Sequence, residues 1–528
     1  PAEPITDPVA RRLAELWATT LGADPAQLGA DSDFFALGGH SLKAMLLAAR
    51  VQRGFGVAVA VRSIYEQPTL GSMADRIRSA TGRHHAPIAV LPPQPRYRVA
   101  PAQQRFFVLH ALSPDTVAYN MPLTVELGGP LDTAKLARAL AALAARHAVL
   151  RTGFALEDGV LFQRVVDAVQ VPVEVVDATE DDVPRLIRGF VRPFDLARPP
   201  LMRALVMRTG PERATLTLDF HHIVLDGFSI GILLREALRL YTGEALPPLH
   251  VQYRDYVAWL DEPAQQHKRE RQAALWTARF AGDIPVLNLP ADRPRPPVRT
   301  MAGGAHTFTL PPGVVEPWRR LARDERASLF MVCLAAFHVF LTKLSGQDRT
   351  VVGTPVAGRS HADLEGIVGV FVNTLALGNR IDARQSFRGL LAEVRTTTLE
   401  ALDHQDYPFE ELVERLNAAR DTTRSPLYDA FLAFHNMDIS APPGAALTVT
   451  QRDPGVPTSK FDLSLFLTES DAGLSAVFEY ASDLFERGTV ERFARYFTTL
   501  CRQIADDPDR PVGVLTLVDD AERARLEA

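Results

Sequence analysis

The sequence contains little cysteine, no long run of one charge and no long apolar run. Its two cysteines, Cys333 and Cys501, lie far apart in apolar or helical stretches, which argues against a disulfide framework or a zinc site. Lys and Arg number 57 against 63 Asp and Glu, so we expect no nucleic-acid partner. The longest apolar stretch, LFMVCLAAFHVFL, is too short for a bilayer span and contains His338, as in a core helix. We therefore expect no bound metal, no membrane partner and a reducing, cytoplasmic location.

Length and proline placement divide the chain. A chain of 528 residues is too long for one ordinary core, and 47% hydrophobic with 23% charged residues is typical of a globular protein. Residues 81–96, TGRHHAPIAVLPPQPR, contain four prolines, which prevent regular structure and stiffen an extended connection. The sequence thus predicts a domain over 1–80, a linker over 81–96 and a larger region from 97 onward.

The first 80 residues have the pattern of a small all-α helical bundle. Asp7 and Pro8 begin one helix, which Gly22 closes, and a last helix follows Pro68 and Thr69. A helix between these begins at Ser41, ends at Gly54 and is expected to bury Leu42, Met45, Leu46 and Ala49. Such a bundle is too small to enclose a large substrate pocket.

Ser41 stands in the stretch DFFALGGHSL, directly after Gly38, Gly39 and His40. One interpretation is an ordinary helix N-cap. The other is covalent attachment of a phosphodiester, since a helix N-terminus stabilises an anion and the glycines leave the hydroxyl accessible. The longer stretch DSDFFALGGHSL resembles the attachment motif of peptidyl carrier proteins, and the resemblance covers residues 6–80. It implies that a phosphopantetheinyl transferase attaches 4'-phosphopantetheine to Ser41. The thiol of that group then holds an aminoacyl or peptidyl group as a thioester.

After residue 97 the pattern is mixed α/β. The stretch ATLTLDFHH alternates polar and apolar residues and predicts a strand, and the motif HHIVLDG lies at its end. Successive strand residues face opposite sides, so His221 and His222 do not both point into one cleft while the strand continues. One imidazole near neutral pH can accept a proton from an amine or position it. The alternative is a core histidine pair capped by Asp226. A metal site at the histidine pair is not indicated, because no additional acidic or cysteine ligands stand at helical or loop spacing nearby.

The stretch HHIVLDGFS is similar to the signature of condensation domains in nonribosomal peptide synthetases. Six further stretches match that family in the same order: APAQQRFFVL, RHAVLRTGF, YRDYVAW, VGVFVNTLAL, HQDYPFEEL and RDTTRSPLY. The resemblance implies a two-lobed α/β chloramphenicol acetyltransferase-like fold with lobes over 97–270 and 271–515. Residues 516–528 resemble the start of a linker to a downstream adenylation domain.

The resemblance also implies roles for residues of the motif. His222 is the catalytic candidate, and His221 is more typical of a structural position. Asp226 is expected to form a salt bridge with Arg151 that supports the site. Gly227 would allow close backbone approach and help to orient a carbonyl.

Asn373 and the stretch GTPVAGR of the second lobe are expected near the tunnel between the lobes. Both either contribute to the site or support the fold.

Peptide-bond formation is the activity that this resemblance implies. The amine of an acceptor aminoacyl group on another carrier would attack the donor thioester on the attached carrier, with adenylation and carrier domains downstream. The alternatives are an epimerisation or ester-forming variant of the same fold, or a non-catalytic recruitment module. The intact His pair argues against the heterocyclisation type, in which paired aspartates replace it.

Overall fold

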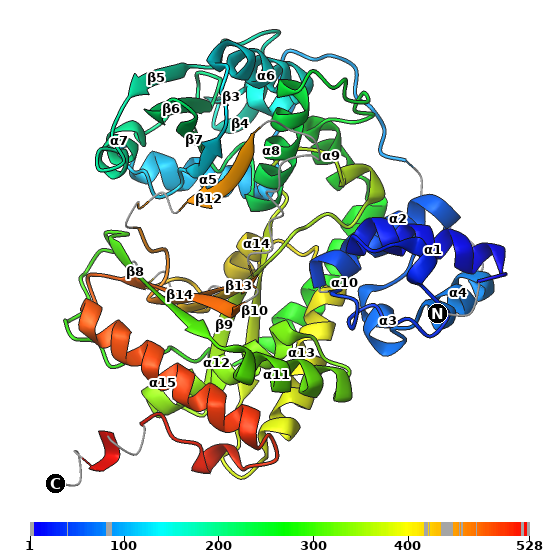
Figure 1. Ribbon diagram of the computed structural model, residues 1–528, viewed down its shortest axis with the longest axis vertical. Helices are drawn as coiled ribbons and strands as arrows, with labels where there is room; N and C mark the ends of the chain where they lie inside the picture. The colour runs from blue at the N-terminus through cyan, green and yellow to red at the C-terminus, as the bar shows by residue number, and fades with distance from the viewer. Residues whose placement is uncertain are drawn as a thin grey trace.

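The structure is a computed structural model with a small helical unit beside two stacked lobes (Figure 1). Residues 81–86 of the predicted linker lie outside the part described, as do His40, Arg420 and Thr422. The described residues are 5–39, 41–80, 87–282, 284–416, 421, 423–434, 447–452, 455, 458–470, 472–518 and 522–524.

The first unit is the predicted helical bundle. Its helices are α1 (Pro8–Leu21), α2 (Ser41–Phe55), α3 (Val61–Glu66) and α4 (Leu70–Ser79). The Asp7 carboxylate caps α1 by accepting the N–H of Ala10 at 2.8 Å, and Gly22 ends α1 with a φ of 77°, a left-handed conformation that suits glycine. The sequence did not predict α3, a six-residue helix without a side-chain cap.

The buried face of α2 differs from the prediction. Ala49 is buried as expected, but Met45 and Leu46 are only half-buried and line a cavity that the carrier shares with the two lobes. The side chain of Leu42 lies outside the described part. The positions of α2 that are fully buried in the bundle core are Ala44, Leu47 and Val51. The predicted apolar face is therefore confirmed at Ala49 and wrong at Met45 and Leu46, which line the cavity instead of joining the bundle core.

The first lobe is built on a five-stranded sheet with the order β12-β2-β7-β6-β5. Its main elements are α5 (Pro101–Leu112), β2 (Leu123–Gly128), α6 (Thr133–Arg146), β5 (Val173–Asp177), β6 (Met202–Gly210), β7 (Arg213–Phe220), α8 (Gly227–Tyr241) and α9 (Tyr253–Leu260). Helix α7 (Val183–Phe190) and a small sheet of β1 (Tyr97–Arg98), β4 (Val160–Val165) and β3 (Thr152–Glu157) complete it.

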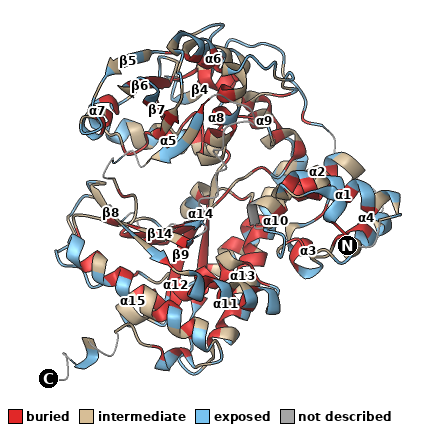
Figure 2. Cartoon of the chain, in the orientation of Figure 1, coloured by how far each residue is buried: buried red, intermediate tan, exposed pale blue. Residues whose placement is uncertain are grey.

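The second lobe is built on a six-stranded sheet with the order β10-β9-β11-β13-β14-β8. Its strands are β8 (Gly303–Leu310), β9 (Arg349–Val356), β10 (Asn373–Arg380), β11 (Ala430–Phe434), β13 (Leu463–Ser470) and β14 (Gly473–Ala481). Helices α11 (Pro312–Asp324), α12 (Leu329–Ser345), α13 (Phe387–Asp403), α14 (Phe409–Arg415) and α15 (Arg487–Asp506) pack with them. Residues 331–341 of α12 are all buried, as predicted for a core helix (Figure 2).

The chain crosses between the lobes more than once. Helix α10 (Pro263–Arg279) spans the predicted boundary at residue 270, and its Trp276 belongs to the second core. Residues 364–371 return to pack in the first core, and β12 (Thr448–Arg452) pairs with β2 of the first sheet. These crossings tie the lobes together around the site.

The described part of the linker is fixed to the first lobe. Ile88 is 2% exposed and donates its N–H to the Asp363 carboxylate at 3.1 Å, and the N–H of Leu91 donates to the Asp255 carboxylate at 2.9 Å.

Within the described ranges no single helix is long and apolar enough to cross a membrane. One pair, α11 and α12, passes by length and composition alone and is bent by 110°.

Candidate active site and carrier attachment site

His222 lies just beyond the end of β7, where its side chain lines a cavity between the lobes. Its Nδ1 is 3.0 Å from the carbonyl oxygen of Leu225, and because a carbonyl only accepts, Nδ1 carries the proton and the lone pair is on Nε2. The Phe106 ring stacks on the imidazole with centroids 4.4 Å apart. Burial lowers the pKa of His222 well below 6.5, and nearby Lys460 lowers it further. The ring is therefore neutral at physiological pH and offers one oriented acceptor.

His221 takes the opposite direction into the core and is 1% exposed. Its Nδ1 accepts the N–H of Ile223 at 3.1 Å, and its ring meets that of His110 edge to face at 5.5 Å. Burial lowers the pKa of His221 to about 3. This placement agrees with the strand alternation argued from the sequence and supports a structural position for His221.

The expected salt bridge between Asp226 and Arg151 is wrong. The Asp226 carboxylate accepts the N–H groups of Ser229, Phe371 and Val372 at 2.8, 2.9 and 3.1 Å, and the arginine beside it is Arg359, at 3.7 Å. Asp226 thus caps α8 and joins it to the segment that returns from the second lobe.

Arg151 instead joins parts of the first lobe to one another. Its guanidinium donates to the carbonyl oxygens of Ala144 at 2.9 Å and Asp167 at 3.1 Å, and also to that of Val166. It therefore joins the end of α6 to the residues that follow β4 and does not reach the loop after His222.

Arg359 is the residue that the sequence analysis missed, although it is the last residue of the stretch GTPVAGR expected near the tunnel. It is 4% exposed, lies between the rings of Phe371 and Phe228 at 4.0 and 4.6 Å, and donates to the Ser229 hydroxyl at 2.9 Å. Burial lowers the pKa of Arg359, while Asp226 raises it. A buried cation needs a partner, so Asp226 and Arg359 depend on each other.

Gly227 and Asn373 both line the cavity. A Cβ added at Gly227 would meet nothing within 4 Å, so glycine here keeps space open beside His222 rather than relieving a clash within the protein. The Asn373 amide donates to the carbonyl oxygens of Gln405 and Tyr407 at 2.8 and 2.7 Å and accepts the N–H of Phe409 at 3.0 Å. These bonds favour the fold-supporting interpretation of Asn373.

Two further titratable residues, Lys460 and Glu479, line the same cavity. Lys460 is 5.4 Å from the centroid of the Tyr119 ring, which in turn is 5.5 Å from that of Phe106 beneath His222. Burial lowers the pKa of Lys460, and burial raises the pKa of Glu479 to about 7, each opposed by the charge of the other. Neither residue belongs to a motif quoted from the sequence, which gave no signal for them.

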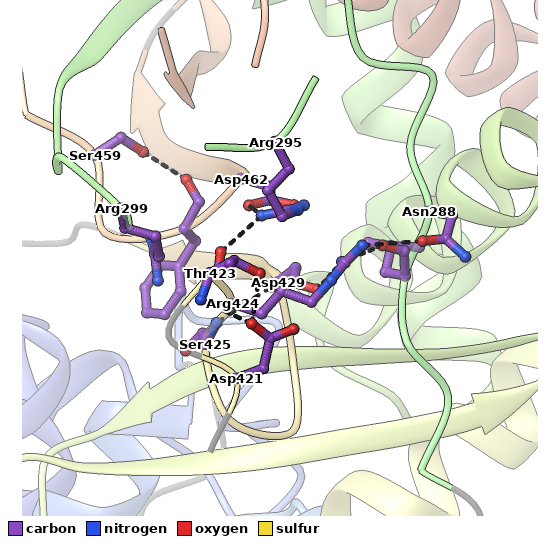
Figure 3. Close-up of polar contacts among 12 residues, drawn as sticks. Asn288, Arg295, Arg299, Asp421, Thr423, Arg424, Ser425, Asp429, Ser459 and Asp462 are labelled. Atoms are coloured by element: carbon purple, nitrogen blue, oxygen red, sulfur yellow. Dashed lines mark hydrogen bonds and ion pairs between the residues drawn. The ribbon is translucent and has the colours of Figure 1, made fainter. Parts of the chain in front are cut away.

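Partly buried Arg–Asp contacts fix the segment that carries Lys460 (Figure 3). Arg295 donates to Asp462 at 2.9 Å, Arg424 donates to Asp429 at 2.7 Å, and Arg299 donates to the carbonyl oxygen of Lys460. Arg424 belongs to the stretch RDTTRSPLY, whose described part therefore acts by holding this segment.

The helical unit is seated against both lobes beside this cavity. Tyr65 of α3 is 1% exposed, packs with the core of the second lobe and stacks on Phe35 at 4.4 Å. The Arg50 guanidinium of α2 donates to the Glu365 carboxylate at 2.8 Å. Apolar and ionic contacts together define a docking face on α2 and α3.

Ser41 is the first residue of α2, and its side chain lies outside the described part. Its neighbours Gly39 and Lys43 line the cavity that also holds His222, which has a volume of about 1820 Å³. A Cβ at Gly39 would lie 2.3 Å from the Phe34 ring, so this glycine is required for packing. Gly38 has a φ of 86° with open space around it, and glycine suits it for conformational reasons.

The two lobes thus meet at a cavity lined by His222, and the helical unit is seated at its edge. A family model described as Condensation domain matches residues 94–527, and one described as Phosphopantetheine attachment site matches residues 11–77. The chain therefore belongs to the condensation-domain family and carries a phosphopantetheine attachment domain before it. The predicted fold class is confirmed.

Named relatives agree with this assignment. Tyrocidine synthase 3 of Brevibacillus parabrevis is 41% identical over 98% of the chain, which spans 8% of that synthase. The crystal structure of the X-domain from teicoplanin biosynthesis has a TM-score of 0.75 and 27% identity, covering 82% of this chain and all of that one. The holo-AB3403 four-domain nonribosomal peptide synthetase bound to AMP and glycine has a TM-score of 0.74 and 25% identity, covering 83% of this chain and 35% of that one.

Proposed function

We propose that this chain is the carrier and condensation part of a modular nonribosomal peptide synthetase. It joins a donor acyl group held on Ser41 to the amine of an acceptor aminoacyl group held on another carrier. The observation that carries the proposal is one cavity that extends from the neighbours of Ser41 to His222. Adenylation and carrier domains of the same synthetase, and a phosphopantetheinyl transferase, are the expected partners.

The residues around Ser41 fit a phosphopantetheine. The 15-residue helix α2 begins at Ser41, so its free N–H groups and positive dipole end would face a phosphate attached there, and open space surrounds Gly38. When attached, the group would supply a thiol that holds the donor as a thioester. Lys43, which also lines the cavity, adds a positive charge near the phosphate.

His222 orients the acceptor and takes its proton. Its Nε2 lone pair accepts an N–H of the attacking amine, while the bond from Nδ1 to Leu225 and the Phe106 ring hold the imidazole in place. The amine nitrogen forms its bond to the donor carbonyl carbon, and the bond from that carbon to sulfur breaks. Because burial disfavours the protonated imidazole, His222 would pass the proton on to the departing thiolate rather than store it, and positioning supplies much of the rate.

The direct test combines attachment and turnover. Intact mass after incubation with coenzyme A and a broad phosphopantetheinyl transferase should show one added arm on the wild type and none on Ser41→Ala. With a phenylalanyl arm and a soluble aminoacyl thioester as acceptor, the wild type should form dipeptide. His222→Gln should lower the single-turnover rate about 100-fold or more without changing the melting temperature. Equal rates for His222→Gln and wild type would refute the role of His222.

One observation favours a second function. The complex of the X-domain and OxyB from teicoplanin biosynthesis has a TM-score of 0.74 and 29% identity to this chain. A recruitment role would make the lobes a binding surface for a partner enzyme and leave turnover undetectable in the assay above.

Location follows from the same reasoning. Both cysteines are buried and free, which suits a reducing compartment, and we propose that the chain works in the cytoplasm.

A further inference from the structure

Three phenylalanines form one side of the cavity on the second lobe. They are Phe431 on β11, Phe466 on β13 and Phe461 just before β13. Strand pairing aligns Phe431 with Ser464 and Ala433 with Phe466, and residues two apart share a face, so Phe431 and Phe466 project from the same side of the sheet. Their rings are 6.2 Å apart, and Phe461 stacks on Phe431 at 4.8 Å. We call these three residues the aromatic wall.

The aromatic wall is only half-buried, although it consists of large apolar rings. The opposite face of the same strands, with Leu432 and Leu465, is fully buried in the core. Apolar rings gathered on the side of a cavity are typical of a binding surface for an apolar group.

The inner end of the wall is rigid and lies toward His222. The Ser459 hydroxyl donates to the carbonyl oxygen of Phe461 at 2.8 Å, and Asp462 is held by Arg295. Lys460, next to Phe461, lies over Tyr119, which contacts the Phe106 ring under His222. A ligand on the wall therefore meets a surface that is already ordered.

The outer end of the wall lies toward the attached carrier. Phe434, the last residue of β11, has its ring 6.1 Å from that of Phe330, in the first turn of α12, and both line the cavity. Tyr65 of the carrier belongs to the hydrophobic core of the second lobe, and Phe330 packs against that core. Tyr65 also lies beside Ser328, which caps α12. The wall thus follows the side of the cavity that leads from the attached carrier to His222.

We propose that the aromatic wall binds the side chain of the donor acyl group on Ser41 and selects an apolar donor, aromatic or branched aliphatic, over a charged one. The inference rests on the proposed function and assigns the substrate class of the donor side. A charged side chain would lose its hydration against phenyl rings that offer no hydrogen bond. The nearby charges of Lys460 and Glu479 already interact with each other, as the pKa shifts of both indicate.

The experiment compares donors on the full chain. A phosphopantetheinyl transferase loads Ser41 from phenylalanyl-, leucyl- or aspartyl-coenzyme A, and the N-acetylcysteamine thioester of alanine serves as acceptor. We expect single-turnover dipeptide formation to be at least about tenfold faster with the phenylalanyl and leucyl donors than with the aspartyl donor. Phe431→Ala should slow the phenylalanyl donor about tenfold, leave the aspartyl donor within twofold, and so abolish the preference.

The matched control is Phe308→Ala. Phe308 is a half-buried phenylalanine of the same sheet, but its ring contacts Phe497 of α15 rather than the cavity. This variant should keep the wild-type preference. Phe461→Leu, a smaller change, should reduce the preference about threefold and serves if Phe431→Ala does not fold.

Each outcome decides the inference. Equal rates for phenylalanyl and aspartyl donors on the wild type would overturn it, as would a Phe431→Ala variant that slows all donors alike at an unchanged melting temperature. Either result leaves the proposed function standing because dipeptide still forms. No dipeptide from any donor would contradict the proposed function and remove the inference with it.

Discussion

Replacing Asp226 tests which arginine forms the buried ion pair with it beside His222. Asp226→Ala leaves three backbone N–H groups without an acceptor and the buried Arg359 without its carboxylate. Removing one partner of a buried ion pair costs about 3–5 kcal/mol, so the lobe that holds α8 should unfold at a clearly lower temperature. At about 2–4 °C per kcal/mol, the melting temperature should fall by at least about 6 °C.

A double-mutant cycle separates the two candidate partners. We expect Asp226→Asn and Arg359→Gln to be coupled by about 1 kcal/mol or more in urea unfolding, because they share one contact. Asp226→Asn and Arg151→Gln should be additive to within about 0.5 kcal/mol. Coupling to Arg151 alone, or a cost of Asp226→Ala below about 1 kcal/mol, would show that the reasoning about the buried pair is incorrect.

Two further predictions concern docking and acid stability. Glu365→Arg places a like charge opposite Arg50 and should slow acyl transfer from Ser41 about fivefold in single-turnover assays. Adding Arg50→Glu should restore the rate. An unchanged rate for Glu365→Arg would contradict the docked position. Burial lowers the pKa of His338 from 6.5 to about 3, so only the unfolded chain binds this proton between those values. Stability should therefore fall below pH 6.5 by up to about 1.4 kcal/mol per pH unit from this residue, and His338→Gln should flatten the melting temperature against pH, whereas an identical slope would refute the assignment.

Local elements could be predicted because their signals are local. Asp7 and Gly22 mark the two ends of α1. The alternation of ATLTLDFHH predicts β7, which ends two residues earlier at Phe220, and it predicts the opposite directions of His221 and His222. Helix α3 escaped prediction because it has only six residues and lacks a side-chain cap, although its Tyr65 anchors the carrier.

Long-range pairings could not be predicted from one sequence. Any of the 57 Lys and Arg residues satisfies the need of Asp226 for a cation, and only the return of residues 364–371 to the first lobe brings Arg359 to it. Met45 and Leu46 fit the apolar face of a helix, and the pattern does not tell whether that face meets its own bundle or another domain. The half-exposed β12 likewise shows no preference for either sheet in its sequence.

The anchored linker limits how far the carrier can move from the first lobe. Helix α4 ends at Ser79, and the N–H of Ile88 is bonded to the carboxylate of Asp363. Asp363 lies two residues before Glu365, the carboxylate that contacts the carrier. Fully extended, the eight residues 80–87 span at most roughly 29 Å. A tether this short keeps the carrier at an effective concentration of about millimolar beside its own docking face, so weak contacts suffice to bring it back. Under the proposed function, an enzyme that loads Ser41 would have to reach it within that distance of Ile88, and other domains of the synthetase would have to approach the carrier as much as the carrier approaches them.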